Sequence, residues 1–180
     1  MKKALIVIDI QNDYFCGGNM ELEGIDDVLI KINKLIKFAK NEGHSIYIIQ
    51  HIMQRKGATF FLPKTVGVEL HEALDAKDTT LVTKHYPNSF RETNLQASLE
   101  KEGIKELIIC GAMTHMCVDS TVRAGFDLGY DITLAEDACA TRDLIFNGHV
   151  VGAKDVQRSF MSALGSVFCE VKAVDEVLDN

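Results

Sequence analysis

The centre of this 180-residue chain is the segment Leu107-Ile108-Ile109-Cys110-Gly111-Ala112-Met113-Thr114-His115-Met116-Cys117-Val118-Asp119-Ser120-Thr121. A short apolar run ends at a glycine, and a tight connection leads to Cys117, where we expect a helix to begin. This order predicts a buried strand followed by a helix whose first turn carries a thiol. Because the unpaired N–H groups of a helix N-terminus favour the thiolate over the thiol, Cys117 is a candidate nucleophile for attack on a carbonyl carbon.

Apolar runs without alternation, which are typical of strands covered on both faces, recur along the chain and are separated by segments with helical spacing. The predicted strands are residues 4–8, 45–50, 80–83, 106–110, 131–134 and 166–171. The predicted helices are residues 25–39, 94–102, 117–129, 147–164 and 174–178. Strands that alternate with helices indicate right-handed βαβ units. The predicted fold class is therefore α/β, a three-layer α/β/α arrangement around a central six-stranded, mainly parallel sheet.

Loops are expected at residues 51–67, 85–90 and 136–142, with a helical turn at residues 69–74. Long loops in compact domains are often functional, and the first of these carries apolar side chains. The stretch Phe60-Phe61-Leu62-Pro63 forms either core or an apolar lid over a substrate, and a lid or a subunit contact is favoured because it interrupts a loop rather than a helix face. By position, Phe15 and Tyr86 are predicted pocket walls.

The composition limits the class of protein. Hydrophobic residues make up 47% of the chain and charged residues 25%, with a formal net charge of −7, which argues against a nucleic-acid or anionic-membrane partner. No apolar run is long enough to cross a bilayer, and the first one ends at Asp9 rather than at a cleavage site. Five cysteines without a C-x-x-C pair favour reduced thiols. We expect a single domain over residues 1–180, located in the cytoplasm.

Three side chains stand at or just beyond the ends of predicted strands. Asp9 follows the first strand, Lys84 the third and Cys117 the fourth. In an open parallel sheet, ligands bind beyond the carboxyl ends of the strands, where the strand order reverses. Alone, each residue has an ordinary structural role, as a turn cap, a solvated charge or a small buried side chain. Their shared placement at one edge of the sheet favours a common function.

Together these groups form a coherent chemistry. A carboxylate at Asp9 can take the thiol proton of Cys117 and later return it to a leaving amine. The backbone N–H groups of residues 112–117 could form an oxyanion hole. Three roles stay open for Lys84: it could lower the pKa of Cys117, orient Asp9 or stabilise developing negative charge.

The same residues belong to longer ordered motifs. These are residues 4–15 (ALIVIDIQNDYF), Lys84 with residues 88–90 and Thr93, residues 111–118 (GAMTHMCV), Thr121, Arg123, Ala124, Asp127, and the pairs at 129–130 and 137–138. In this combination and spacing the chain resembles the isochorismatase-like cysteine hydrolases, which include nicotinamidases, N-carbamoylsarcosine amidases and streptothricin hydrolase-like proteins. Each motif is short, but their order extends over nearly the whole chain.

The resemblance implies a catalytic triad of Asp9, Lys84 and Cys117. It also implies a cis peptide bond between Ala112 and Met113 that directs the N–H groups of Met113 and Cys117 at one oxygen. Isochorismatase itself lacks the cysteine nucleophile, so Cys117 places the chain with the amide-cleaving branch. Members of the family commonly form dimers or tetramers, and we expect a homodimer or homotetramer.

Metal-dependent nicotinamidases carry an Asp-x-His pair after the second strand. Here that region is Gln50-His51-Ile52-Met53, followed later by His71, and the aspartate is missing. A stable zinc site needs three or more good protein ligands, so we expect no metal and no other cofactor, with His51 near the substrate pocket. Nicotinamide therefore ranks below a generic small amide as the substrate.

The leading hypothesis is a metal-independent cysteine amidohydrolase that works through a thioester. A non-catalytic scaffold of the same fold that binds a ligand or partner is the main alternative, followed by a metal-assisted nicotinamidase. A redox role for Cys117 is weakened because no resolving cysteine is evident. A dyad of Cys117 with the neighbouring His115 ranks below the pairing with Asp9, and Cys16 lacks a helix start behind it.

Overall fold

The computed structural model describes residues 2–179, and its central feature is a sheet in the order β3-β2-β1-β4-β5-β8. Its strands are β1 (Ala4–Ile8), β2 (Ser45–His51), β3 (Thr80–Lys84), β4 (Glu106–Ala112), β5 (Asp131–Ala140) and β8 (Glu170–Lys172). All neighbouring strands are parallel, which confirms the predicted six-stranded sheet. The strand order reverses between β1 and β4, so this pair is the switch point.

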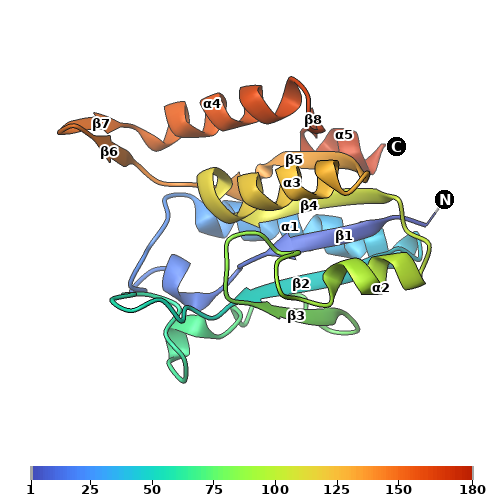
Figure 1. Ribbon diagram of the computed structural model, residues 1–180, viewed down its shortest axis with the longest axis horizontal. Coiled ribbons are helices and arrows are strands. Elements are labelled where there is room, and N and C mark those ends of the chain that lie inside the picture. Colours follow the sequence, from blue (N-terminus) through green and yellow to red (C-terminus); the bar gives the residue numbers. More distant parts are fainter. Residues whose placement is uncertain (1, 180) are drawn as a thin grey trace.

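The continuous apolar runs explain the three layers. Leu5 and Val7 point to one face, into a core shared with α1 and α5, whereas Ile6 and Ile8 point to the other face. Figure 1 shows α1 behind the sheet and α2 and α3 in front of it. The helices are α1 (Ile25–Asn41), α2 (Leu95–Lys101), α3 (Asp119–Asp127), α4 (Ala153–Gly165) and α5 (Val174–Leu178). None of the helices within residues 2–179 has the length and apolarity needed to cross a membrane.

Gly111 allows β4 to approach β1 at the switch point. It has a φ of 122°, and a Cβ atom added there would collide with the backbone of Ile8. The pairing of β4 with β5 shifts register between Ile109 and Gly111, as at a β-bulge. Asp9, directly after β1, also has a left-handed φ of 55°, a conformation that Asp adopts more readily than most residues. Both strands therefore end in unusual backbone at the same point.

Two predictions next to the switch point are wrong. The helical segment begins at Thr114 rather than at Cys117, because residues Thr114–Val118 form a π-helical turn (η3) before α3. In this wide turn the carbonyl of Met113 accepts hydrogen bonds from the N–H groups of both Met116 and Val118. The predicted loop at residues 136–142 is mostly strand, because β5 continues to Ala140 and pairs with the extended end of β4.

The start of the predicted helix at residues 147–164 is also wrong. Residues Leu144–Phe146 (β6) and His149–Val151 (β7) form an antiparallel hairpin, and α4 begins only at Ala153. Asn147 and Gly148 connect the strands with φ angles of 49° and 78°, as a tight two-residue turn requires.

Two further boundaries differ from the predictions. The expected helical turn at residues 69–74 is absent, since Leu70 instead forms an antiparallel bridge with Gln11. The last strand of the sheet is shorter than predicted, because α4 extends to Gly165 and a turn follows it before β8.

We expect Gly111→Ala to lower the free energy of unfolding by about 3 kcal/mol or more, since the new methyl group meets backbone that cannot move away. Urea denaturation measures this loss. The matched control is Gly129→Ala, which also has a positive φ (84°) but open space around its Cα. It should lose only about 1 kcal/mol. Equal losses in the two variants would contradict the close packing of β4 on β1.

Candidate active site

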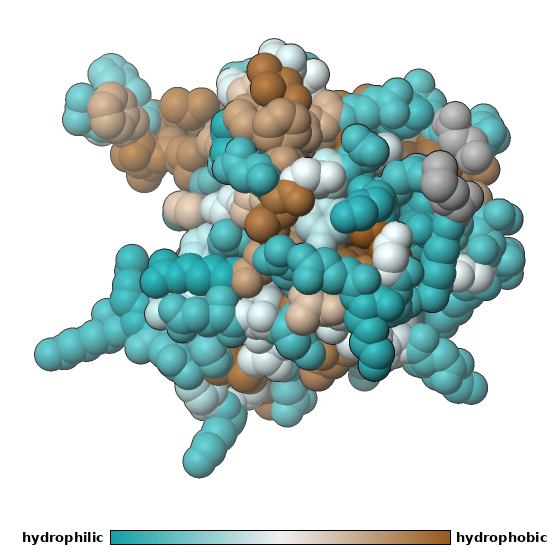
Figure 2. Space-filling model, turned by 45° about the vertical axis from the view of Figure 1, so that its right-hand side comes forward, coloured by the Kyte–Doolittle hydropathy of each residue, from teal (hydrophilic) through white to brown (hydrophobic). Residues whose placement is uncertain are grey.

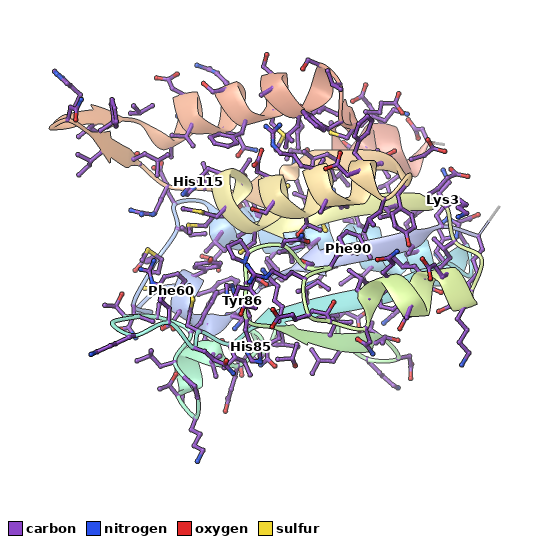
Figure 3. All side chains as sticks on the ribbon, in the orientation of Figure 1. Lys3, Phe60, His85, Tyr86, Phe90 and His115 are labelled. Carbon is purple, nitrogen blue, oxygen red and sulfur yellow. The ribbon has the colours of Figure 1, made fainter. Side chains whose placement is uncertain are left out.

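The carboxyl ends of four neighbouring strands bring together four polar side chains. Asp9 follows β1, His51 ends β2, Lys84 ends β3, and Cys117 lies on the η3 turn after β4. All four are buried, with exposed fractions of 0%, 2%, 0% and 4%. In Figure 3, Phe60, Tyr86 and His115 mark this end of the molecule, and Lys3 lies at the opposite end. The structure thus brings the three residues of the predicted triad to one place and adds His51.

Asp9 and Lys84 form a buried ion pair with 2.9 Å between Oδ2 and Nζ. Lys84 Nζ also donates a hydrogen bond of 3.0 Å to the carbonyl of Pro87. Burial by itself would raise the pKa of Asp9, but the positive charge of Lys84 and the contact with His51 outweigh it and hold the pKa below its ordinary value. Burial would lower the pKa of Lys84, and the charge of Asp9 instead raises it. Both groups are therefore charged at neutral pH.

The Cys117 thiol lies beside this pair. Its burial, and then the negative charge of Asp9, raise its pKa well above the ordinary value, and the opposing effect of Lys84 is smaller. The thiol therefore has a different local environment from the one expected, because the turn begins three residues earlier, at Thr114, and the sulfur is buried. Both the burial and the neighbouring carboxylate thus raise the pKa of Cys117 and favour the thiol over the thiolate.

His51 lies between the thiol and the carboxylate. Its Nδ1 is 3.7 Å from Sγ of Cys117 and 3.7 Å from Oδ2 of Asp9. Its Nε2 is buried and has no hydrogen-bond partner among the described residues. The side chain of Gln11 fixes the backbone of His51, since it accepts from the His51 N–H at 2.8 Å and donates to the His51 carbonyl at 2.9 Å. Nothing in the sequence pattern marks Gln11 for this role.

Aromatic side chains line the same region. Tyr14 is buried, and its pKa is raised well above the ordinary value by burial and then by the neighbouring Cys117. Its ring packs on Phe61, with centroids 4.7 Å apart, and on Phe60 at 6.0 Å. Asp13 fixes the backbone of Phe61, since its carboxylate accepts a hydrogen bond from the N–H of Phe61. Phe60 thus belongs to an aromatic cluster with Tyr14 and Phe61, neither of which was among the predicted pocket residues.

The other two predicted pocket residues, Phe15 and Tyr86, have ring contacts outside the charged cluster. Phe15 stacks on His71, with ring centroids 3.8 Å apart, and lines a separate cavity of about 570 Å³. Tyr86 is covered by the guanidinium of Arg91, 3.6 Å from its ring centroid. A larger cavity, of about 780 Å³, lies at the amino ends of the strands near Lys3, and none of the four buried polar side chains lines it.

The turn that carries Cys117 contacts the end of β5 through two polar side chains. The peptide bond between Ala112 and Met113 is cis. Nδ1 of His115 is 2.6 Å from Oγ1 of Thr141, and the pKa of His115 is lowered by its burial. The hydroxyl of Thr114 contacts the carbonyl of Ala140 at 3.1 Å. His115 is therefore engaged with the end of β5, which leaves His51 as the histidine beside the thiol.

A metal ion does not fit this arrangement well. The donor atoms of Asp9, His51 and Cys117 lie within 4.8 Å of one another, the spacing that a bound cation would need. However, the ammonium of Lys84 already lies 2.9 Å from Asp9 Oδ2, so a divalent cation would have to sit beside a buried positive charge. His71, the second histidine considered from the sequence, stacks on Phe15 and does not join the cluster.

This chain is similar in sequence and in fold to known proteins. The isochorismatase domain profile matches residues 3–166. An uncharacterized isochorismatase family protein of Bacillus subtilis is 43% identical, with 99% of each chain covered. Streptothricin hydrolase of Streptomyces noursei is 31% identical over 97% of this chain and 60% of its own length. The crystal structure of a cysteine hydrolase from Pseudomonas syringae covers 99% of this chain and 91% of its own, with a TM-score of 0.92 and 26% identity.

The matched region contains the strands of the sheet from β1 to β5, and it contains every residue of the buried cluster. A shared fold alone does not require a family match over most of the chain or 43% identity to a relative that is covered over 99% of its length. This chain belongs to the isochorismatase family of hydrolases.

Proposed function

We propose that the protein is a cysteine amidohydrolase that cleaves a C–N bond of a small molecule through a thioester on Cys117. The observation that carries the proposal is the convergence of a buried Asp9–Lys84 ion pair and a buried thiol at the switch point of the sheet. Two charges and a nucleophile without solvent have little structural value there, because an apolar core would be at least as stable. Such perturbed groups cluster at functional sites.

In the proposed reaction, Asp9 accepts the proton of the Cys117 thiol as the sulfur attacks the amide carbon. The backbone N–H groups of Met113 and Cys117 stabilise the oxyanion of the tetrahedral intermediate. The C–N bond then breaks, and Asp9 returns the proton to the leaving nitrogen, which departs as an amine or ammonia. A water molecule, deprotonated by Asp9, hydrolyses the thioester and releases a carboxylic acid and the free thiol.

The geometry supports a specific role for Lys84 among the three that the sequence left open. Its ammonium is held between Asp9 and the carbonyl of Pro87, so it orients the carboxylate and keeps it ionised. It does not lower the pKa of Cys117 enough to produce a resting thiolate. Proton transfer to Asp9 is therefore coupled to the attack, and a bound substrate is needed to complete it.

The surroundings favour a small substrate with an apolar side. Tyr14 and Phe61 form a buried aromatic wall, and Phe60 is half-buried beside them. The unpartnered Nε2 of His51 offers one hydrogen bond to a polar group of the substrate. Relatives are named as a streptothricin hydrolase and a cysteine hydrolase, which agrees with cleavage by a thiol but leaves the amide itself open. Nicotinamide stays below other small amides in our ranking.

The central prediction concerns Cys117. A screen of nicotinamide, pyrazinamide, carbamoyl amines, lactams and ureides, read out as ammonia release or mass change, should identify a substrate. Cys117→Ala should lower its turnover by at least about 1,000-fold, since the covalent path is lost. The matched control is Cys139→Ala, a buried thiol on β5 outside the cluster, which should keep turnover within about threefold.

The same screen separates the alternatives. Asp9→Asn should accumulate the thioester, or fail to form it, and intact-protein mass spectrometry distinguishes the two states. Turnover that survives in Cys117→Ala would sink the thiol mechanism. Turnover lost on dialysis against EDTA and restored by zinc would favour the metal-assisted alternative. Tight binding of a panel compound without turnover in the wild type would favour the non-catalytic scaffold.

The free energy of unfolding should reveal the Asp9–Lys84 pair without any knowledge of the substrate. In the wild type, the depressed pKa of Asp9 contributes stability that is present above its ordinary value of 3.8 and lost as the pH falls below it. In Lys84→Met, burial raises the pKa of Asp9 instead, so the folded state binds a proton more tightly than the unfolded state. The loss of stability should therefore grow from about pH 4 to about pH 7, where we expect about 3–5 kcal/mol.

Urea denaturation across this pH range provides the measurement. Lys40→Met is the matched control, because it removes the same charge from a partly exposed pair with Asp75. That variant should lose at most about 1 kcal/mol. A loss in Lys84→Met that is small, or that does not change with pH, would mean that Asp9 and Lys84 are not a buried charged pair.

A further inference from the structure

Ser89 and Thr121 form a pair of hydroxyl groups inside the molecule that the proposed reaction does not use. Whereas the β6–β7 hairpin exposes its apolar side chains, which are brown in Figure 2, these two polar side chains are fully buried. Their hydroxyl oxygens lie 2.9 Å apart, and the Ser89 N–H donates a second hydrogen bond, of 3.1 Å, to the Thr121 hydroxyl. Because a buried hydroxyl group is unfavourable without a hydrogen-bond partner, the pair favours one fixed arrangement of the two segments that carry it.

The pair joins the loop after β3 to α3. Ser89 lies two residues after Pro87, whose carbonyl accepts a hydrogen bond of 3.0 Å from the ammonium of Lys84. Thr121 lies four residues after Cys117 on the helical segment formed by η3 and α3, which is about one turn further along. The contact therefore connects the peptide that holds the ammonium to the helix that carries the thiol.

A second contact holds the other side of this loop. Nδ1 of His85, which lies next to the end of β3 in Figure 3, is 2.9 Å from the carbonyl oxygen of Ile52. Pro87 is midway between His85 and Ser89, so the two contacts together determine the position of its carbonyl. The hydroxyl of Thr93 donates to the Ser89 carbonyl at 2.7 Å, a hydrogen bond that shapes the loop but does not reach α3.

The position of Lys84 matters because of its effect on Asp9. Burial is the largest influence on the pKa of Asp9 and raises it, and the charge of Lys84 is the main influence that lowers it. The other titratable groups that face Asp9 are His51 from β2, Cys117 from η3 and Tyr14 from the loop after β1. An ammonium that moved away would favour the neutral acid of Asp9, which cannot accept the thiol proton.

We propose that Ser89 and Thr121 are positioning residues, which hold the carbonyl of Pro87 where it keeps the Lys84 ammonium against Asp9. A lysine side chain has large rotamer freedom, and a fixed carbonyl beside the carboxylate restricts it. The effect of the pair on turnover rests on the proposed thiol mechanism, whereas its effect on the ion pair does not. Misplacement of a catalytic group by about 1 Å can lower a rate by about 100-fold.

Urea denaturation at about pH 4 and about pH 7 tests the ion pair without a substrate. Thr121→Val removes the hydroxyl at similar side-chain size. Its ratio of folded to unfolded protein should fall at least about 10-fold more at pH 7 than at pH 4, because a displaced Lys84 lets burial raise the pKa of Asp9. Ser89→Ala breaks one of the two hydrogen bonds and should show a smaller effect in the same direction, so it also serves if Thr121→Val does not fold. Thr121→Ser keeps the hydroxyl and should restore the wild-type pH dependence.

Thr79→Val is the matched control for this measurement. The hydroxyl of Thr79 donates a hydrogen bond of 2.7 Å to the carbonyl of Ala76, near the opposite end of β3 from Lys84. The same chemical change is thus made away from the ion pair, and its loss of stability should be equal at the two pH values. A pH-independent loss in Thr121→Val, or a pH-dependent loss that Thr121→Ser does not restore, would identify a merely structural pair and overturn the proposal.

Turnover of a substrate from the panel gives the second readout. Thr121→Val should lower kcat by at least about 10-fold and leave KM within about threefold, since the displaced group acts on the chemical step rather than on binding. The acid limb of the pH profile of kcat/KM should shift upward by about half a unit or more, because Asp9 has to be ionised. Thr121→Ser should restore both quantities, and Thr79→Val should leave both unchanged.

The two readouts separate failure of this proposal from failure of the thiol mechanism. An unchanged kcat and acid limb in Thr121→Val, together with active wild type and inactive Cys117→Ala, would refute the positioning role alone. Turnover that survives in Cys117→Ala would refute the thiol mechanism. In that case the stability measurement still decides whether Ser89 and Thr121 hold Lys84 in place, since it needs no substrate.

Discussion

The buried ion pair between Asp9 and Lys84 is the interaction on which the site depends. Removing two charges from water is unfavourable, and only a short, well-oriented contact offsets it. The sheet supplies that contact, because β1 and β3 flank β2 and end at the same edge, so Lys84 reaches Asp9 past the end of the middle strand. One consequence is a carboxylate that stays ionised. The other is that this carboxylate adds to the effect of burial and raises the pKa of the neighbouring Cys117 thiol.

Two residues of the first loop of the chain hold the surroundings of this pair. Gln11 fixes the end of β2 through both backbone groups of His51, and it also donates to the carbonyl of Val68. Asp13 holds the Phe61 N–H and packs closely against Gly67, where a Cβ atom would strike its carboxylate. The short motif after β1 therefore contributes the buried carboxylate of Asp9 and two side chains, Gln11 and Asp13, that fix neighbouring backbone. These two side chains determine where the aromatic wall stands relative to the thiol.

The sequence predicted the parts that depend on local pattern. Continuous apolar runs marked the strands, and Asp9, Lys84 and Cys117 followed from strand ends. It failed where distant contacts decide the structure. Residues 136–140 look like a polar loop, yet Asp137 is held by Lys31 and by the N–H of Val174, which allows β5 to continue. The β6–β7 hairpin did have a local signal, since Asn147-Gly148 between Leu144-Ile145-Phe146 and His149-Val150-Val151 is a strong hairpin turn. The helical spacing of Val150, Val151 and Val156 favoured a helix over residues 147–164 instead.

The turn that carries Cys117 and the β6–β7 hairpin are connected through the residues that follow β5. Thr141 contacts His115 on the turn that carries Cys117, and β6 begins three positions further on, at Leu144. Ala140, the last residue of β5, contacts Thr114 on the same turn. The β6–β7 hairpin therefore follows directly from the segment that holds this turn. In the proposed mechanism a nucleophile held in one geometry reacts faster than a mobile one, so the contacts of Thr114 and His115 with this segment would favour attack by Cys117.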